Sequence, residues 1–465
     1  MSTPNSVYVS MHEQVSYYSM FPIRIPFKRN CSNGGRSWKK SCPQSSANPK
    51  ASMRPLSFNR FVRSFLFPLM RTVTLSLAFM ALTQCKPGAT QEPVALEIEL
   101  SEMPVFQRDY WPTDGWRKKE LPGADRWKDL EDYAFSRQGT EEERAGIRTD
   151  SVVIIKDGYL VYERYAAGYT EKMPHLTWSV SKSVLQALVG RAVQQGLMEL
   201  DDPIEKYIPE GKKEKTITIR HLLHMSSGLD ANEGYESGPL TSTVIAMLYT
   251  RGRDDMARFC ASLPTRAEPG AMVYYSSCDT NIVSGALKEA LIARNGKEAG
   301  EEAYARYPWT ELFEPLGMDT AVWERDASGT FVGSSYLYAS PRDMARFAFL
   351  FLNDGVWEGK RLLPENWLEF TRKVAPAYST TSPYPGWDAG YTSHWYSNSG
   401  VPGRDLKPAW PSAPEDTFAA SGHWGQMIFV IPSLDLIIVR MGDDRDYSFD
   451  KDVFLKKVLE ALELR

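Results

Sequence analysis

Two neighbouring apolar runs near the C-terminus restrict the fold of this chain more than any other feature of its sequence. Residues 427–431 are all apolar, residues 434–439 are apolar except for Asp435, and the two runs flank the short turn Pro432-Ser433. A strand with one face in water alternates apolar and polar residues, so runs without alternation indicate strands that are covered on both faces. We therefore expect a pair of strands buried within a sheet beneath helices.

A second strand pair lies at the other end of the folded region. Residues 151–155 and 159–165 are rich in β-branched and aromatic residues, and Lys156-Asp157-Gly158 between them carries the Asp-Gly signal of a tight turn. These two pairs, far apart in the sequence, predict one antiparallel sheet built from both ends of the chain.

The middle of the chain has the periodicity and the capping residues of helices. Ser340 before Pro341, with Gly355 at the far end, bounds one of them. Helices are expected at about 179–197, 218–225, 340–355 and 451–464. The sequence thus predicts an α+β fold, an antiparallel β-sheet flanked by helices, with an inserted and mostly helical lobe at about 201–320.

The first 85 residues differ from the rest in charge. They contain eleven Lys and Arg but one acid, a net charge of +10, whereas the remaining residues carry 43 bases and 57 acids, a net charge of −14. An acidic body argues against a nucleic-acid partner, because phosphate binding needs clustered Lys and Arg. A hydrophobic content of 43% excludes a disordered chain.

The basic head is typical of an export signal. Residues 72–82 are an uninterrupted apolar stretch, too short to span a bilayer comfortably and suited to the core of a signal peptide. The following Leu82-Thr83-Gln84-Cys85 resembles a lipoprotein signal, in which Cys85 becomes the lipidated first residue; an uncleaved anchor is the alternative. We expect residues 1–85 to be an export signal with an upstream extension, 86–140 an irregular N-terminal wrap, and 141–465 the catalytic domain.

Two cysteines remain in the body, Cys260 and Cys278. An oxidising compartment permits a disulfide between them, and two buried free thiols are the alternative. His221 and His224, three residues apart on a short predicted helix, lack a third ligand and are expected to be structural. The sequence therefore predicts no metal site.

The strongest chemical signal is Trp178-Ser179-Val180-Ser181-Lys182 at the start of a predicted helix. Ser179 and Lys182 are three residues apart, so their hydroxyl and amine lie on one helix face. The helix N-terminus favours an anion beside Ser179, and a buried, neutral Lys182 could take the serine proton. The alternative is an N-cap serine followed by a surface lysine. The Gly-x-Ser-x-Gly and His-Glu-x-x-His signatures of other hydrolases are missing.

Two later segments accompany this pair: Pro269–Ser277, which contains Tyr274-Tyr275, and Ser421–Gln426, which enters the buried strand. In this order the three segments resemble the serine β-lactamase and penicillin-binding superfamily in its class C-like branch, and within it the 6-aminohexanoate-dimer hydrolases and related esterases. The resemblance covers about 150–445 and includes Arg220–Gly228 and Pro315–Met318.

The resemblance implies roles for individual residues. Ser179 would be the acyl-forming nucleophile and Lys182 its proton acceptor. Tyr275 would pass the proton to the leaving group and then help to activate water, with the adjacent Tyr274 as the competing residue. Ser277 stands where many relatives have Asn, and its contact is expected with the substrate or with Lys182.

The third motif of the family is Lys-Thr-Gly in its penicillin-recognising members and reads His423-Trp424-Gly425 here. By this resemblance Gly425 lies against the substrate backbone, and the N–H of Gln426 pairs with that of Ser179 as an oxyanion hole. The missing Lys favours an esterase or linear-amide hydrolase over a β-lactamase. Tyr235 resembles a tyrosine that closes over the substrate in aminohexanoate-dimer enzymes; a loop tyrosine without function is the alternative.

The sequence thus predicts a serine hydrolase of the cell envelope or periplasm that cleaves a small ester or amide through an acyl-enzyme at Ser179. We expect it to be a lipoprotein attached to the membrane through Cys85. No cofactor and no nucleic-acid partner are expected. The alternatives are a true β-lactamase or D-amino-acid peptidase, and a non-catalytic recognition protein that keeps the penicillin-binding fold.

Overall fold

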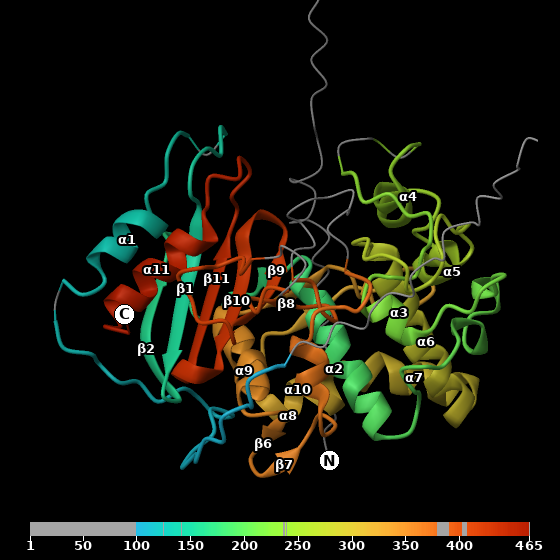
Figure 1. Ribbon diagram of the computed structural model, residues 1–465, viewed down its shortest axis with the longest axis horizontal. Helices are drawn as coiled ribbons and strands as arrows, with labels where there is room; N and C mark the ends of the chain where they lie inside the picture. The colour runs from blue at the N-terminus through green and yellow to red at the C-terminus, as the bar shows by residue number, and fades with distance from the viewer. Residues whose placement is uncertain are drawn as a thin grey trace, which may run out of the picture. The chain divides into compact units, whose positions relative to one another are not determined.

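A six-stranded antiparallel sheet forms the centre of the computed structural model, in the order β2-β1-β11-β10-β9-β8 (Figure 1). The strands are β1 (Thr149–Lys156), β2 (Tyr159–Tyr165), β8 (Tyr396–Ser397), β9 (Phe418–Gly422), β10 (Gln426–Ile431) and β11 (Leu436–Gly442). Among the described strands, the first in sequence, β1, pairs with the last, β11, along its whole length. The predicted sheet from both chain ends is therefore confirmed.

The structure describes residues 99–464 except 124, 141, 236, 237, 239, 379–389 and 402–406. The expectations for the export signal and for a lipidated Cys85 lie outside these residues. In the part of the chain that is described, no helix combines the length and the apolar character needed to cross a membrane.

The two predicted hairpins are present, and their turns follow from residues that accept left-handed backbone. Asp157 and Gly158 have φ of 54° and 81°, the pair of positive values that the tight turn between β1 and β2 requires. The turn between β10 and β11 runs through Pro432–Leu434 and ends at Asp435 with φ of 45°. Both turns hold the strands in the register that buries their apolar residues.

The sheet is covered on both faces, which explains why its strands lack alternation. Val153 and Ile155 of β1 face a core shared with helices α2 (Val180–Gln194) and α9 (Pro341–Leu352). Val152 and Ile154 face a second core. That core is closed by α1 (Lys128–Ala134) and α11 (Lys451–Ala461), which pack on each other (Figure 1).

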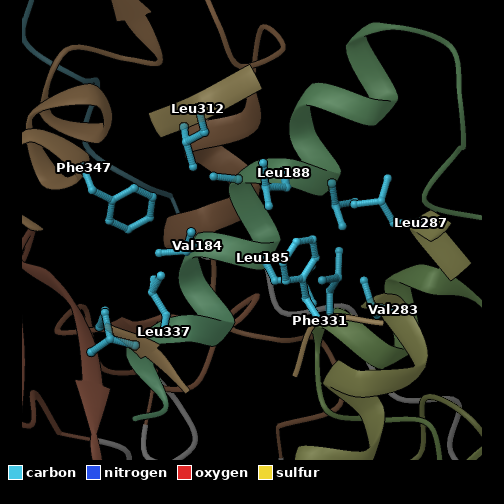
Figure 2. Close-up of a cluster of buried hydrophobic side chains, with 14 of the residues drawn as sticks. Val184, Leu185, Leu188, Val283, Leu287, Leu312, Phe331, Leu337 and Phe347 are labelled. Carbon is cyan, nitrogen blue, oxygen red and sulfur yellow. The ribbon is translucent and has the colours of Figure 1, made fainter. Parts of the chain in front are cut away.

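Helix α2 is buried on nearly every side, and it carries the predicted nucleophile at its start. Its residues Val184, Leu185 and Leu188 lie among side chains from several other elements (Figure 2). These neighbours include Val283, Leu287, Leu312, Phe331, Leu337 and Phe347. A helix that is enclosed by packed side chains on nearly every side is fixed in position, so its N-terminus is a rigid platform.

The predicted helical lobe lies between α2 and α9. Its helices are α3 (Ile219–Leu223), α4 (Thr243–Tyr249), α5 (Met256–Ala261), α6 (Ser277–Asn295), α7 (Lys297–Pro308) and α8 (Glu314–Leu316). A disulfide joins Cys260 of α5 to Cys278 of α6. The alternative of two free thiols is therefore excluded in this structure.

The expected N-terminal wrap contains one helix that sequence reasoning did not foresee. The described residues between 99 and 127 form no helix, but α1 follows because Leu130 and Ala134 are fully buried on the sheet side. Arg108, in the segment before α1 that forms no helix, makes a 2.7 Å ion pair with Asp435 in the turn between β10 and β11. The remaining elements are β3 (His175–Leu176), β4 (Val322–Trp323), β5 (Leu337–Ala339), β6 (Val356–Trp357), β7 (Lys360–Arg361) and α10 (Trp367–Arg372).

Candidate active site

Ser179 is the residue directly before α2, at a sharp turn into the helix. Trp178 takes a left-handed conformation there, with φ of 50°, and Ser181 Oγ donates to its carbonyl oxygen over 2.6 Å. A serine at this position usually caps the helix through its side chain. The Ser179 side chain makes no capping bond. Its hydroxyl is therefore free for chemistry, unlike that of the simple N-cap serine considered above.

Lys182 is a buried residue and not a surface lysine, since only 2% of it is exposed. Its Nζ lies 3.1 Å from Ser179 Oγ, 3.2 Å from Ser277 Oγ and 2.9 Å from the Ser334 carbonyl oxygen. Burial lowers the pKa of Lys182 to about 8, while the negative charge of Glu233 acts in the opposite direction. A substantial neutral fraction near physiological pH makes this amine a competent base for Ser179.

Tyr275, and not Tyr274, faces the pair. The Lys182 ammonium lies 4.9 Å from the centre of the Tyr275 ring. Burial raises the pKa of Tyr275 well above its usual value, and a hydrogen bond with Ser179 opposes that rise. The phenol is therefore protonated at neutral pH and has a proton to donate. The Tyr274 ring instead packs against the Arg266 guanidinium, at 4.1 Å.

Ser277 is the first residue of α6, and both of its polar groups bind one carboxylate. Its N–H donates to Glu233 Oε2 over 2.8 Å and its hydroxyl donates to Glu233 Oε1 over 2.6 Å. Its oxygen also accepts from Lys182. Of the two contacts expected for Ser277, the structure shows the one with Lys182. Glu233 and Ser334 are site residues that sequence reasoning missed.

His423-Trp424-Gly425 forms the tight turn between β9 and β10, in which Gly422 pairs with Gln426. Burial lowers the pKa of His423 to about 4, and the nearby positive Arg445 acts in the same direction. His423 is therefore neutral at pH 7. It does not replace the positive charge of the family's Lys.

Gly425 and Gln426 serve the turn itself. Gly425 has φ of 87°, and a Cβ there would overlap Arg440 and Asp444, so protein packing by itself already requires glycine. Gly425 also lines the cavity beside Ser179, and its contact with a substrate stays a prediction. The Gln426 amide donates to the Gly442 carbonyl oxygen over 2.6 Å and accepts from its N–H over 3.0 Å. This side chain is fully buried in the sheet. These bonds use the side chain of Gln426, whereas the role expected for Gln426 belongs to its backbone N–H and stays a prediction.

A cavity of about 570 Å³ opens in front of Ser179. Its described lining includes Tyr235, Tyr275, Tyr396, Trp410, Lys451 and the turn 421–425. The Tyr235 ring is stacked on His423 with ring centres 5.4 Å apart, and its hydroxyl donates to Glu233 Oε1 over 3.2 Å. The structure thus places Tyr235 against the nucleophile's cavity, beside the third motif.

The two helical histidines have structural partners, as predicted. The Thr218 N–H donates to His221 Nδ1 over 3.2 Å, which caps α3, and His224 Nδ1 lies 3.1 Å from the Thr392 carbonyl oxygen. Burial lowers the pKa of His224 to about 4. Within the described ranges, no group of three His, Cys, Asp or Glu is arranged to hold a metal ion.

The fold and the arrangement around Ser179 match a known family. A sequence model of the beta-lactamase family aligns with residues 137–455, which is more than half of the chain. The chain belongs to the beta-lactamase family. The aligned range includes Ser179, Lys182, Tyr275 and the turn 423–425, so the predicted resemblance and the predicted α+β fold are both confirmed.

Several members of the beta-lactamase family are similar to this chain. A 6-aminohexanoate-dimer hydrolase of Paenarthrobacter ureafaciens is 25% identical over 305 residues, which are 63% of this chain and 72% of that protein. A D-alanyl-D-alanine-carboxypeptidase/endopeptidase of Escherichia coli strain K12 is 26% identical over 205 residues, 39% of this chain and 49% of that protein. A Bacillus anthracis structure assigned as a 6-aminohexanoate-dimer hydrolase shares the fold, with a TM-score of 0.54 and 20% identity over 75% of this chain and 86% of that one.

Proposed function

We propose that this protein is a serine hydrolase that cleaves a linear ester or amide through an acyl-enzyme at Ser179. One observation carries the proposal: Lys182 Nζ lies 3.1 Å from Ser179 Oγ, and burial brings the pKa of Lys182 down to about 8. An ordinary exposed lysine is almost fully protonated at pH 7 and cannot accept the serine proton. Membership of a family whose relatives above include named hydrolases supports the proposal.

In the proposed acylation, Ser179 Oγ attacks the substrate carbonyl carbon and its proton moves to the neutral Lys182 amine. The tetrahedral intermediate then collapses, the bond to the leaving group breaks, and the leaving oxygen or nitrogen takes a proton from the Tyr275 hydroxyl. The Lys182 ammonium returns a proton to Tyr275. Because the Tyr275 phenol is protonated in the resting enzyme, it is ready to donate at that step.

Deacylation reverses the proton movements, with water as the nucleophile. Tyr275 takes a proton from the attacking water while it passes its own hydroxyl proton to the neutral Lys182 amine. The bond between the acyl carbon and Ser179 Oγ then breaks, and Ser179 takes a proton from the Lys182 ammonium. The products are the free acid and the regenerated enzyme.

The negative oxygen of the tetrahedral intermediate needs backbone donors. Strand β9 passes very close to the segment before Ser179, since a Cβ on Gly422 would overlap the Thr177 carbonyl oxygen. The turn that follows Gly422 lines the cavity. We therefore place the second donor, beside the Ser179 N–H, at the end of this turn where it enters β10, which includes the N–H of Gln426.

A neutral chromogenic ester and an active-site probe test the proposal. The purified protein is mixed with p-nitrophenyl butyrate and, separately, with a fluorophosphonate, in parallel with Ser179→Ala. We expect a burst of p-nitrophenol and one phosphonate on Ser179, with neither in the variant. Absence of burst and labelling in the natural chain, or equal labelling of the variant, would show a non-catalytic recognition protein.

A second substrate class has its own observation. Lys451 lines the same cavity, and its Nζ lies 3.4 Å from Ser421 Oγ on β9. The adjacent Asp452 is engaged elsewhere, because its two oxygens accept from the N–H and the hydroxyl of Ser412. The Lys451 ammonium could therefore bind a substrate carboxylate, such as that of a β-lactam or a D-amino-acid peptide.

Nitrocefin separates the two classes. If β-lactams are substrates, the purified protein hydrolyses nitrocefin, and Lys451→Met lowers kcat/KM for nitrocefin while leaving p-nitrophenyl butyrate largely unaffected. Turnover of the neutral ester without nitrocefin turnover assigns the protein to the esterase and linear-amide class.

We also propose that the protein is exported to the cell envelope. The disulfide between Cys260 and Cys278 supports this, because disulfides persist in oxidising compartments and are rare in the cytosol. Cell fractionation with metabolic palmitate labelling, comparing the natural chain with Cys85→Ser, tests the export and the lipid attachment together. Recovery of unlabelled protein in the cytosol would contradict both.

A further inference from the structure

Glu233 holds a central position in the site although no step of the reaction above uses it. It stands in the loop that carries Tyr235, and its two oxygens bind the N–H and the hydroxyl of Ser277 over 2.8 and 2.6 Å. Ser277 opens the 19-residue helix α6, whose N-terminus favours a carboxylate at this place. Three hydrogen bonds, including that from the Tyr235 hydroxyl, fix the carboxylate beside the proposed base.

The bonds to Glu233 determine what Ser277 can offer to Lys182. A serine hydroxyl has one hydrogen, and a carboxylate only accepts. Since that hydrogen goes to Glu233, the Ser277 oxygen can only accept from Lys182, over 3.2 Å. Without the carboxylate, the hydroxyl could turn and donate to the Lys182 nitrogen.

Counting the hydrogen-bond donors and acceptors around Lys182 also determines the direction of its lone pair. A neutral amine has two N–H groups and one lone pair. The Ser334 carbonyl oxygen, at 2.9 Å, and the Ser277 oxygen accept the two N–H groups. The lone pair is left for the third neighbour, the Ser179 hydroxyl at 3.1 Å, which is the direction needed to remove its proton.

Charge acts alongside this orientation. Burial lowers the pKa of Lys182, and Glu233 raises it in part. The other groups around Lys182 are the protonated Tyr275 phenol, the neutral His394, whose ring bonds the Lys182 carbonyl oxygen, and Asp279 of α6, whose pKa is raised to about 7 by burial. Removing the charge of Glu233 should therefore lower the pKa of the base.

We propose that Glu233 is a positioning residue: it holds Ser277 as an acceptor and so directs the lone pair of Lys182 at Ser179. The inference rests on the proposed function. The Tyr235 hydroxyl binds the same carboxylate and the Tyr235 ring is stacked on His423 at the cavity wall. The carboxylate thus connects the orientation of the base to the loop that borders the substrate cavity.

Glu233→Gln tests the proposal, because it keeps the shape but loses the charge and one acceptor oxygen. The rate of phosphonate labelling of Ser179 is measured from pH 5 to 10 in the natural chain, in Glu233→Gln and in Glu268→Gln. Glu268 is an exposed carboxylate on the segment leading to Tyr275 and is the matched control. We expect Glu233→Gln to label about 10-fold to 100-fold more slowly on its high-pH plateau and the midpoint of its acid limb to fall by about 1 pH unit.

The outcomes are distinguishable. A natural chain that labels at Ser179, together with a Glu233→Gln profile equal to that of Glu268→Gln, overturns the role of Glu233 and leaves the proposed function intact. A natural chain without labelling overturns the proposed function instead. If Glu233→Gln does not fold, Ser277→Ala removes the bridging hydroxyl while keeping the charge. Its plateau should then fall, and an unchanged plateau would also overturn the proposal.

Discussion

Arg440 and Asp444 form a buried ion pair directly behind the turn that borders the active site. Two bonds of 2.6 and 3.0 Å join the guanidinium to the carboxylate, and the side chains are 0% and 3% exposed. The guanidinium also donates to the Gly425 carbonyl oxygen over 2.8 Å, and the Asp444 N–H donates to the Trp424 carbonyl oxygen over 3.1 Å. The pair therefore fixes the backbone of the third motif.

Asp444→Asn should destabilise the fold. It leaves the buried Arg440 charge without its carboxylate, a change that typically costs about 3–5 kcal/mol. Urea denaturation followed by fluorescence measures the free energy of unfolding. Asp132→Asn, which breaks an exposed pair with Lys128, is the control and should change it by less than about 1 kcal/mol. Equal changes in the free energy of unfolding would show that the buried pair stabilises the fold no more than the exposed pair does.

Gly425→Ala should lower both stability and activity. Its φ of 87° strains any residue with a Cβ, and the new methyl would overlap Arg440 and Asp444. Gly359→Ala is a matched control, because Gly359 has φ of 74° but nothing within 4 Å of the added carbon. We expect the control to lose about 1 kcal/mol and Gly425→Ala clearly more, with a slower burst. Similar losses of stability in the two variants would show that Arg440 and Asp444 move aside for the added methyl without destabilising the fold.

The rate of acylation should follow the ionisation of Lys182. The amine is a base only when neutral, and its pKa is about 8, so kcat/KM should rise through that pH and level off above it. At pH 6 the expected value is about 100-fold below the plateau. Stopped-flow burst kinetics over pH 5–10 measures the profile. A flat profile between pH 6 and 9 would show that Lys182 is not the base.

The disulfide should stabilise the helical lobe. It closes a loop of 18 residues between Cys260 and Cys278, for which chain entropy predicts about 3 kcal/mol. The double variant Cys260→Ser/Cys278→Ser should therefore unfold at lower urea concentration than the natural chain. Reductant should shift the natural chain toward the variant and leave the variant unchanged. Two reactive thiols in the unfolded, unreduced protein would contradict the disulfide.

Local patterns predicted the sheet and the proximity of Ser179 to Lys182 well. The apolar runs at 427–439 and the turn at Asp157-Gly158 depend on neighbouring residues alone, and so does the helical spacing of Ser179 and Lys182. The partners of Lys182 could not be predicted in this way. Ser334 lies 152 residues along the chain and Glu233 reaches the amine only through Ser277, so their roles arise from tertiary packing.

The third motif shows the limit of reasoning by resemblance. The family pattern located the turn with Gly425, but the overlap that demands glycine comes from Arg440 and Asp444, which the pattern did not indicate. The side-chain amide of Gln426 joins β10 to Gly442 at the end of β11. Sequence order therefore located the turn, whereas the residues that hold it in place come from tertiary packing.

Tyr275→Phe should distinguish the role proposed for Tyr275 from that of the adjacent Tyr274. The change removes the hydroxyl proposed to protonate the leaving group, while the ring still packs at 5.8 Å from Tyr391, so the fold should be retained. Loss of a proton donor of this kind typically lowers the rate about 10²-fold to 10⁴-fold. Tyr274→Phe is the matched control, since the Tyr274 ring lies against Arg266, and this variant should keep most of the activity.

The loss of rate in Tyr275→Phe should be larger for an amide than for p-nitrophenyl butyrate, because p-nitrophenolate leaves without a proton and an amine does not. Equal losses of rate with the two substrates would show that Tyr275 positions Ser179 and does not protonate the leaving group.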